Sequence, residues 1–284
     1  MRVIVCVKQV PNTNEVRLDP KTGTLIRDGV PSIINPDDLA GIEAALQLKD
    51  KYGFEIVAVS MGPPQADTAL REALAMGVDK AYLVSDRAFG GADTWATSNT
   101  LAAAIKKIGY DLIIAGRQAI DGDTAQVGPQ TAEKLNIPQI TYAEELLDIN
   151  REAVTIKRRL ERGIEVVQAK LPVMITVHSS APDCRPRHAR LTMKYKHART
   201  ASELQEASNH YTALRDTRPY LNINEWTVAD LNANDAWLGL NGSPTKVKKI
   251  DNVVLTHKDA TVMTSSEQDI DLLMKELIAS HVIG

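Results

Sequence analysis

Between residues 1 and 140 the chain alternates short apolar segments with segments of helical periodicity, and this alternation restricts the fold more than any other feature. The apolar segments are rich in β-branched residues, as interior strands are. Short buried strands separated by helices form parallel sheets with right-handed crossovers. We therefore predict an α/β fold with a doubly wound parallel sheet, whose strands cover residues 3–7, 55–60, 80–85 and 111–115.

Four helices are expected between and after these strands. The first opens at the sequence NPDD with Asp37 as its N-cap, and the second runs through Met76. A third helix is predicted at residues 93–108. A fourth covers residues 124–135 and ends at Asn136, with Pro138 beyond it. Turn residues between 12 and 29 predict a hairpin excursion after the first strand.

Beyond residue 138 the pattern changes to strand-like segments at residues 139–142, 154–157, 166–170 and 173–177. We expect them to form an antiparallel extension at the edge of the parallel sheet. The polar, Asn-rich residues 201–241 indicate an exposed C-terminal arm. A last amphipathic helix is expected to begin with Ser265 as its N-cap.

The composition excludes several kinds of site. With only Cys6 and Cys184, the chain by itself can form neither a four-cysteine zinc site nor an iron–sulfur cluster, and six histidines without ligand spacing predict no metal. No nucleophile motif or phosphate-cradling GxxxxGK[ST] motif occurs, and no residue is expected to be catalytic. A formal charge of −3 gives no general attraction to nucleic acid. Without a leader sequence or a membrane-length apolar run, we expect a cytoplasmic protein that does not insert into membranes.

Residues 115–136 convert a predicted strand into a helix through a loop rich in small and polar residues. Open α/β sheets bind ligands at the carboxyl ends of their strands, where this loop lies. Gly122 and Gly128 let a ligand approach the backbone, and amides of a helix beginning near Thr124 or Ala125 suit a phosphate. The loop is therefore a candidate nucleotide site.

Two carboxylates in this loop, Asp121 and Asp123, would repel a phosphate that they faced. Asp123 or Thr124 can instead serve as the helix N-cap, and Asp121 can accept a ribose hydroxyl. The residues alone are thus compatible both with a nucleotide site and with a capped loop that binds nothing.

A second segment of interest is DRAFGGADTWAT at residues 86–97. The glycine pair that begins at Gly90 gives room for a flavin, and Asp93, Thr94 and Thr97 offer polar contacts at a helix start. A flexible loop followed by an Asp or Thr N-cap explains the same residues.

The segment GRQAIDGDTAQVGPQTA at residues 116–132 resembles the nucleotide-binding loop of the electron-transfer flavoprotein beta subunit. Its VGPQTA portion and the segment at residues 86–97 resemble the electron-bifurcating branch of that family. VCVKQVPNT, DGVPSIINPDD and ALQLKDKYG follow the beta-subunit pattern in order. IKRRLERGIEVVQAKLPVMITV is similar to a second family signature, except that Arg162 stands where an acid or a glycine is typical.

This resemblance implies a site that holds AMP in ordinary members and a full FAD in the bifurcating branch. The residues that it assigns to cofactor binding come from the ends of predicted strands and from both loops. They are Cys6, Val7, Lys8, Asn35, Asp37, Ser60, Met61, Phe89, Gly90, Asp93, Thr94, Thr97, Gly116, Arg117, Gln118, Ala119, Asp121, Gly122, Asp123, Thr124, Ala125, Gln126, Val127, Gly128, Pro129, Gln130 and Thr131.

The resemblance also implies a mechanism. NADH would deliver a hydride to FAD in this subunit, and the two electrons would then go separately to a second FAD in an alpha subunit and to ferredoxin or flavodoxin. An acyl-CoA dehydrogenase or a quinone-linked oxidoreductase is a further expected partner. Two alternatives remain: a subunit that holds only a structural AMP, and a stand-alone protein that senses or hydrolyses an adenine nucleotide.

Residues 180–200 are strongly basic, which fits either a solvated face or a docking loop for an acidic redox partner. By resemblance the docking residues are Arg187, Arg190 and Lys194, with Leu191 as the apolar anchor. The expected organisation is a nucleotide-binding α/β domain at residues 1–200, with this loop, followed by an arm and helix at residues 201–284 that contact the partner subunit.

Overall fold

The computed structural model describes residues 1–12, 31–206, 214–246 and 262–283. Residues Met1–Lys248 form one compact unit and Lys249–Gly284 form a second. The hairpin expected between residues 12 and 29 lies almost wholly outside the described residues. Across the described parts of the chain, the structure contains no helix with the length and apolar character needed to cross a membrane.

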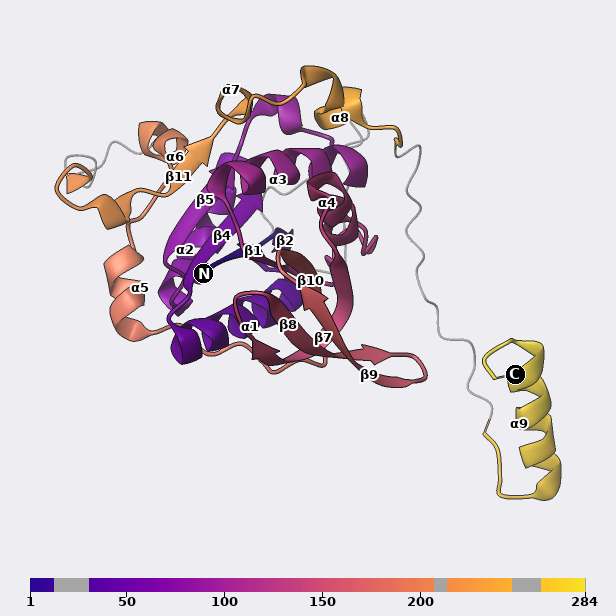
Figure 1. The fold of residues 1–284 in the computed structure, drawn as a ribbon. Helices are drawn as coiled ribbons and strands as arrows, with labels where there is room; N and C mark the ends of the chain where they lie inside the picture. Colours follow the sequence, from indigo (N-terminus) through magenta and orange to yellow (C-terminus); the bar gives the residue numbers. More distant parts are fainter. Residues whose placement is uncertain (13–30, 207–213, 247–261, 284) are drawn as a thin grey trace. The chain divides into compact units, whose positions relative to one another are not determined.

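A nine-stranded sheet organises the first unit (Figure 1). Its order is β11-β5-β4-β1-β6-β10-β7-β8-β9, and every pairing from β11 to β7 is parallel. β8 and β9 continue the sheet antiparallel to β7. This confirms the predicted α/β class with an antiparallel extension. The strands are β1 Arg2–Cys6, β4 Glu55–Met61, β5 Lys80–Val84, β6 Leu112–Gly116, β7 Gln139–Ile149, β8 Ala153–Leu160, β9 Gly163–Lys170, β10 Val173–Val177 and β11 Asn224–Trp226.

One strand differs from the sequence prediction. β10 was expected in the antiparallel extension, but it lies between β6 and β7 and runs parallel to both. All five of its residues are buried, which requires covering on both faces and suits the interior of a parallel sheet. A separate two-stranded antiparallel sheet joins β2 Gln9–Pro11 to β3 Ser32–Ile34.

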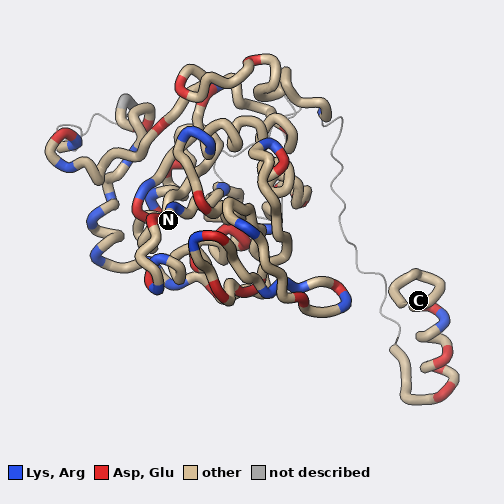
Figure 2. The backbone as a smooth tube through the Cα atoms, in the orientation of Figure 1, with Lys and Arg blue, Asp and Glu red and all other residues tan. Residues whose placement is uncertain are grey.

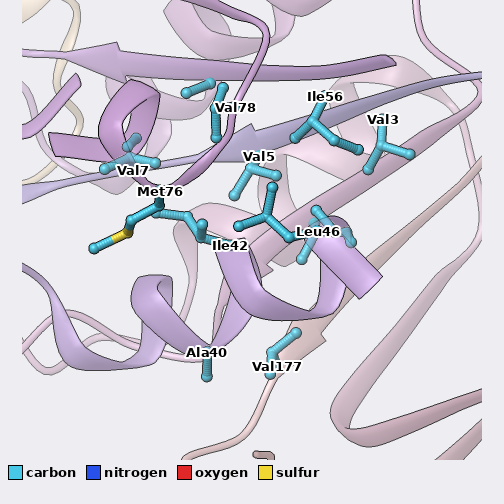
Figure 3. Close-up of a cluster of buried hydrophobic side chains, with 14 of the residues drawn as sticks. Val3, Val5, Val7, Ala40, Ile42, Leu46, Ile56, Met76, Val78 and Val177 are labelled. Atoms are coloured by element: carbon cyan, nitrogen blue, oxygen red, sulfur yellow. The ribbon is translucent and has the colours of Figure 1, made fainter. Parts of the chain in front are cut away.

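Helices cover both faces of the parallel part of the sheet. Successive residues of a strand point to opposite faces, so Val3 and Val5 pack with Ile42 on the side of α1 and α2, whereas Ile4 packs with Leu101 on the side of α3 and α4. Figure 3 shows the first of these two apolar layers. The helices are α1 Pro36–Tyr52, α2 Asp67–Met76, α3 Thr94–Ile108, α4 Val127–Leu135, α5 Ala189–Tyr195, α6 Ala201–Glu206, α7 Val228–Leu231 and α8 Gly239–Gly242, with 3-10 turns η1 Pro64–Ala66, η2 Arg87–Phe89, η4 Pro219–Leu221 and η5 Asp235–Trp237.

Two predicted helix starts in the first unit are wrong. α1 begins at Pro36 with Asn35, not Asp37, as its N-cap residue, because proline favours the first helical position. α4 begins at Val127 with Gln126 before it, not at residue 124 or 125. Asp123 and Ala125 have φ values of 48° and 52°, a left-handed conformation that a right-handed helix cannot include. Neither Asp123 nor Thr124 therefore caps this helix.

Residues 214–246 are not the exposed arm that their polar composition indicated. β11 pairs with β5 at the edge of the sheet, and the rings of Trp226 and Tyr82 lie 4.6 Å apart. Leu231 and Leu238 are buried in the apolar layer of α3. The compact unit thus extends past residue 200 to Lys248. Whether residues 201–284 contact a partner subunit stays a prediction.

The second unit contains α9 Glu267–Ala279. Its N-cap is Ser266, not Ser265, because the Ser266 hydroxyl oxygen accepts the backbone N–H of Asp269 at 3.2 Å. The carboxylate of Asp269 in turn accepts the backbone N–H of Thr264 at 2.8 Å. The helix start is therefore fixed one residue later than the sequence pattern indicated.

The contact between α4 and β10 leaves no space at Gly128. A methyl group on this residue would lie 2.8 Å from Thr176 Cγ2, whereas one on Gly122 would meet nothing within 4 Å. We expect Gly128→Ala to lower the free energy of unfolding by about 1–3 kcal/mol because α4 must move off the sheet. Gly122→Ala should change it by less than about 0.5 kcal/mol. Urea denaturation of both variants measures this, and equal losses would contradict the packing argument.

Candidate functional site

The candidate site lies where the chain changes direction across the sheet. β4 pairs with one side of β1 and β6 with the other, so the edge at the carboxyl ends of these three strands is a topological switch point. The N-terminus of α1 meets the same edge. The structure therefore brings together the predicted residues at 6–8, 35–37, 60–61 and 116–126.

Asn35 organises the loop at residues 116–126, called the main loop here, which follows β6 at this edge. Its buried side chain donates from Nδ2 to the carbonyl of Gln118 at 2.9 Å and accepts the N–H of Ile120 at Oδ1 at 3.1 Å. Its own backbone N–H donates to the carbonyl of Lys8 at 2.9 Å. One residue thus ties the loop after β6 to the end of β1.

Asp38, the last residue of the Asn-Pro turn that the resemblance implies as a nucleotide contact, makes a second connection. Its Oδ2 accepts the backbone N–H of Lys8 at 2.7 Å, and its Oδ1 accepts that of Gly116 at 3.1 Å. Gly116 must be glycine, because a methyl group there would lie 2.2 Å from Oδ1. The available sequence signal was a second acidic residue directly after the predicted N-cap, Asp37.

Burial controls the titration of two groups at this edge. It raises the pKa of the Asp38 carboxyl to about 7, against the opposing effect of its hydrogen bonds to Lys8, Asn35 and Gly116. Burial, assisted by the charge of Asp38, also raises the pKa of the Cys6 thiol to about 12. Cys6 is therefore a neutral thiol at physiological pH and lacks the thiolate that a nucleophile needs.

The acidic residues of the main loop have partners, which answers the objection that they would repel a phosphate. Asp121 pairs with the Lys8 ammonium at 2.6 Å, and its side chain is only 3% exposed. Asp123 accepts Nε2 of Gln118 at 2.6 Å. Asp121 is therefore paired with a cation, and Asp123 accepts a hydrogen bond from a side chain of the same loop.

The two glycine-rich segments meet through side chains. Thr94, the first residue of α3, donates its hydroxyl to Gln126 Oε1 at 3.3 Å, and Gln126 Oε1 also accepts Nε2 of Gln130 at 3.3 Å. One turn further along α3, Ser98 donates to Gln130 Oε1 at 3.4 Å. α3 and α4 therefore place the loop at residues 86–93 beside the loop at residues 116–126.

Several predicted ligand residues have side chains committed to the protein itself. Val7 and Phe89 are buried in the two apolar layers, so only their backbone atoms can face a cofactor. The buried Thr131 hydroxyl donates to the carbonyl of Val127 at 2.7 Å. Asp93 caps α3 by accepting the N–H of Ala96 at 3.0 Å, as the sequence also allowed.

Two buried polar atoms near these loops lack a hydrogen-bond partner within the described residues. They are the hydroxyl of Ser60 at the end of β4 and Nδ2 of Asn99 in the second turn of α3. Buried polar groups are normally satisfied, so each is available to a polar ligand. Ser60 belongs to the predicted set and Asn99 does not. Asn99 lies among other polar residues of α3, Thr97, Ser98 and Thr100, so nothing in the sequence sets it apart.

Two residues of the main loop have a left-handed backbone conformation. Non-glycine residues rarely adopt positive φ, and such conformations concentrate at ligand sites. Asp123 and Ala125 both do so here, within three residues and directly before α4. The loop is thus built to a particular shape and not for helix capping. Over the ranges that the structure describes, no group of His, Cys, Asp and Glu residues is arranged to hold a metal ion.

The basic segment is only partly available for docking (Figure 2). Arg185 is bound by Glu43 at 2.8 Å and by Asp50 at 2.7 Å, and Arg187 lies 3.4 Å from Glu72. The remaining predicted docking residues lie on α5. Leu191 is half-buried against the apolar layer, the Lys194 ammonium lies 4.8 Å from the centre of the Tyr195 ring, and Arg190 is exposed.

Asp38 gives the site a testable pH dependence. A carboxyl with a raised pKa costs folding free energy when it ionises, so its unfavourable contribution grows as the pH rises from about 4 towards 7 and is complete above. Asp38→Asn cannot ionise. Its stability relative to the unmodified protein should therefore rise by about 1–4 kcal/mol between pH 5 and pH 8.5.

Denaturation at both pH values measures this difference. Asp123→Asn, on the solvent side of the same loop, is the control and should not show that gain. Parallel pH curves for Asp38→Asn and the unmodified protein would contradict a raised pKa of the buried Asp38 carboxyl.

Comparison with known proteins agrees with this geometry. A family model for the electron transfer flavoprotein domain matches residues 22–206. The electron transfer flavoprotein subunit beta of Clostridium acetobutylicum is 50% identical over 88% of this chain and 87% of its own length. Subunit CarD of the caffeyl-CoA reductase-Etf complex of Acetobacterium woodii is 49% identical over 87% and 86%.

A third relative covers almost the whole chain. Protein FixA of Bradyrhizobium diazoefficiens is 39% identical over 99% of this chain and 92% of its own length. The family model spans both loops and the β7–β9 extension. The chain therefore belongs to the electron transfer flavoprotein beta subunit family.

Proposed function

We propose that this chain is the beta subunit of a heterodimeric electron-transfer flavoprotein that binds FAD, accepts a hydride from NADH and serves flavin-based electron bifurcation. The observation that carries the proposal is the junction between the two loops, where Thr94 reaches Gln126 at 3.3 Å. An AMP seat needs only the strand ends and the main loop. A flavin extending from that seat needs a second wall, and residues 86–97 supply one.

The residues present fit such a group. Backbone N–H groups in the first turn of α4 suit the phosphates, whereas those of Gly116, Arg117 and Ile120 donate within the protein. The unpartnered Ser60 hydroxyl and Asn99 amide suit polar atoms of the ligand, and Gly90 allows close approach of a planar ring. The Lys8 and Asp121 pair orients the loop. Bound FAD would supply the hydride and one-electron chemistry, for which the protein offers position and electrostatics.

The partners follow from the same proposal. An alpha subunit would hold the second FAD, ferredoxin or flavodoxin would take the low-potential electron, and an acyl-CoA dehydrogenase or a quinone-linked oxidoreductase would take the other. Exposed cations on α5, such as Arg190, suit an acidic partner surface. The complex would work in the cytoplasm. The name of the CarD relative, a subunit of a caffeyl-CoA reductase-Etf complex, supports a role within a redox complex.

Cofactor content tests the proposal directly. We expect the chain, purified with its alpha subunit, to hold FAD in both subunits and no AMP, and NADH should bleach the flavin absorbance within the mixing time. One FAD and one AMP per heterodimer would instead identify a subunit with a structural nucleotide, the alternative that the AMP seat alone favours. Acid extraction followed by chromatography counts both nucleotides.

Asn35 should be needed to shape the nucleotide loop. Asn35→Ala removes the bonds to Gln118 and Ile120, and we expect affinity for the nucleotide in this subunit to fall by about tenfold because the loop loses two fixed contacts. Asn150→Ala is the matched control. Its side chain also makes two hydrogen bonds to the backbone, as acceptor of the N–H groups of Glu152 and Ala153 in the turn between β7 and β8. Equal affinities of the two variants, measured by equilibrium dialysis, would show that the loop does not depend on Asn35.

A further inference from the structure

Residues 224–245, called the strap here, run alongside the loop between β5 and α3. Successive residues of the two segments contact one another in the same order. The N–H of Ser85 donates to the carbonyl of Trp226 at 2.9 Å, directly beyond the β5–β11 pairing. The N–H of Val228 donates to Asp86 Oδ2 at 3.2 Å. Contacts between the two segments therefore begin where β5 ends.

The register continues to the end of the loop. The N–H of Leu240 donates to the carbonyl of Gly90 at 2.9 Å, and the N–H of Asp93 donates to the Ser243 hydroxyl oxygen at 2.8 Å. Thr245 donates both its N–H and its hydroxyl to Asp93 Oδ2, at 2.9 and 2.7 Å. The later a residue lies in the loop, the later its partner lies in the strap.

Asp93 is the point where the strap is fastened. Its Oδ1 caps α3 and its Oδ2 binds Thr245, so both carboxylate oxygens have partners within the protein. Although burial opposes it, the N–H groups of Ala96 and Thr245 lower the pKa of Asp93. Asp93 is therefore a fixed anion that joins the strap to the start of α3.

The strap is packed closely against the loop. Gly239 has a φ of 53°, and a methyl group on it would lie 2.1 Å from the carbonyl oxygen of Ala88. Leu238 is buried beneath it, and the ring of Trp237 meets that of Trp95 edge-on at 6.0 Å. Hydrogen bonds to the strap occupy backbone groups of Ser85, Gly90 and Asp93, so the strap fixes both ends of the loop.

We propose that the strap is a positioning element that holds the glycine-containing loop at residues 86–93 in the shape that receives the flavin, with Ser243 and Thr245 acting through Asp93. This inference rests on the proposed FAD site. A loop with adjacent glycines samples many conformations, and fixing one of them before binding lowers the entropic cost of taking up a ligand. The strap thereby favours a ligand that contacts this loop over AMP, which does not need it.

The test compares three variants in the complete heterodimer. Ser243→Ala with Thr245→Val removes two side-chain contacts to Asp93, Thr245→Ser keeps the hydroxyl, and Asn234→Ala removes a cap inside the strap that bonds only to Ala236. The readouts are the FAD dissociation constant in this subunit, the AMP dissociation constant after FAD removal, the flavin midpoint potential and the thermal midpoint. A purely structural role would move only the last.

We expect the double variant to bind FAD about tenfold more weakly while its AMP affinity changes less than twofold, and to shift the flavin potential. Thr245→Ser should behave as the unmodified chain, and Asn234→Ala should alter only thermal stability. Unchanged FAD affinity and potential in the double variant, with FAD in both subunits of the unmodified complex, would overturn the strap proposal and leave the proposed function intact. AMP in place of FAD in the unmodified complex would overturn both.

Discussion

The hydrogen bonds between the Asp38 carboxylate and two backbone N–H groups are the constraint on which the site depends. They join the end of β1 to the end of β6 across the switch point, where no strand pairing can continue. Asn35 fixes the next stretch of loop from the same helix start. The desolvated carboxyl has a raised pKa, so the chain accepts an electrostatic cost at the position that aligns its ligand loop. The packing of α1 against the sheet makes that cost tolerable.

Structural features with a local cause in the sequence were predicted correctly, and features that depend on distant residues were not. The strands at residues 55–60 and 80–85 were located within one residue of β4 and β5, because an apolar run bounded by turns is a local signal. The fold class followed from their alternation with helices. The place of β10 did not, because a buried strand carries no mark of which neighbours it will join. The start of α4 was misplaced because left-handed Asp123 and Ala125 look like ordinary helix-start residues in a sequence.

The site shows the same division. Asn35, Lys8 and the loop at residues 116–126 were recognised from a family pattern, and the structure brings them together. Asn99 was missed because its importance comes from burial of its amide, which depends on elements distant in sequence. The polar residues 201–241 were interpreted as an exposed arm for a related reason. From residue 226 onward, this part of the chain hydrogen-bonds to backbone and side-chain atoms of residues 85–93, more than 130 positions away, and composition cannot distinguish such partners from water.

The position of β10 has a consequence for the order of assembly. The N–H of Arg117, near the start of the main loop, donates to the carbonyl of Val177 at 2.8 Å. The loop is therefore attached to a strand that lies 60 residues later in the chain. Strand pairing over such a separation waits for the distant segment. During synthesis the first four strands can associate as soon as they emerge, but the ligand edge is completed only when β10 inserts beside β6. If the chain binds FAD as proposed, its binding edge is complete only after most of the polypeptide has been made.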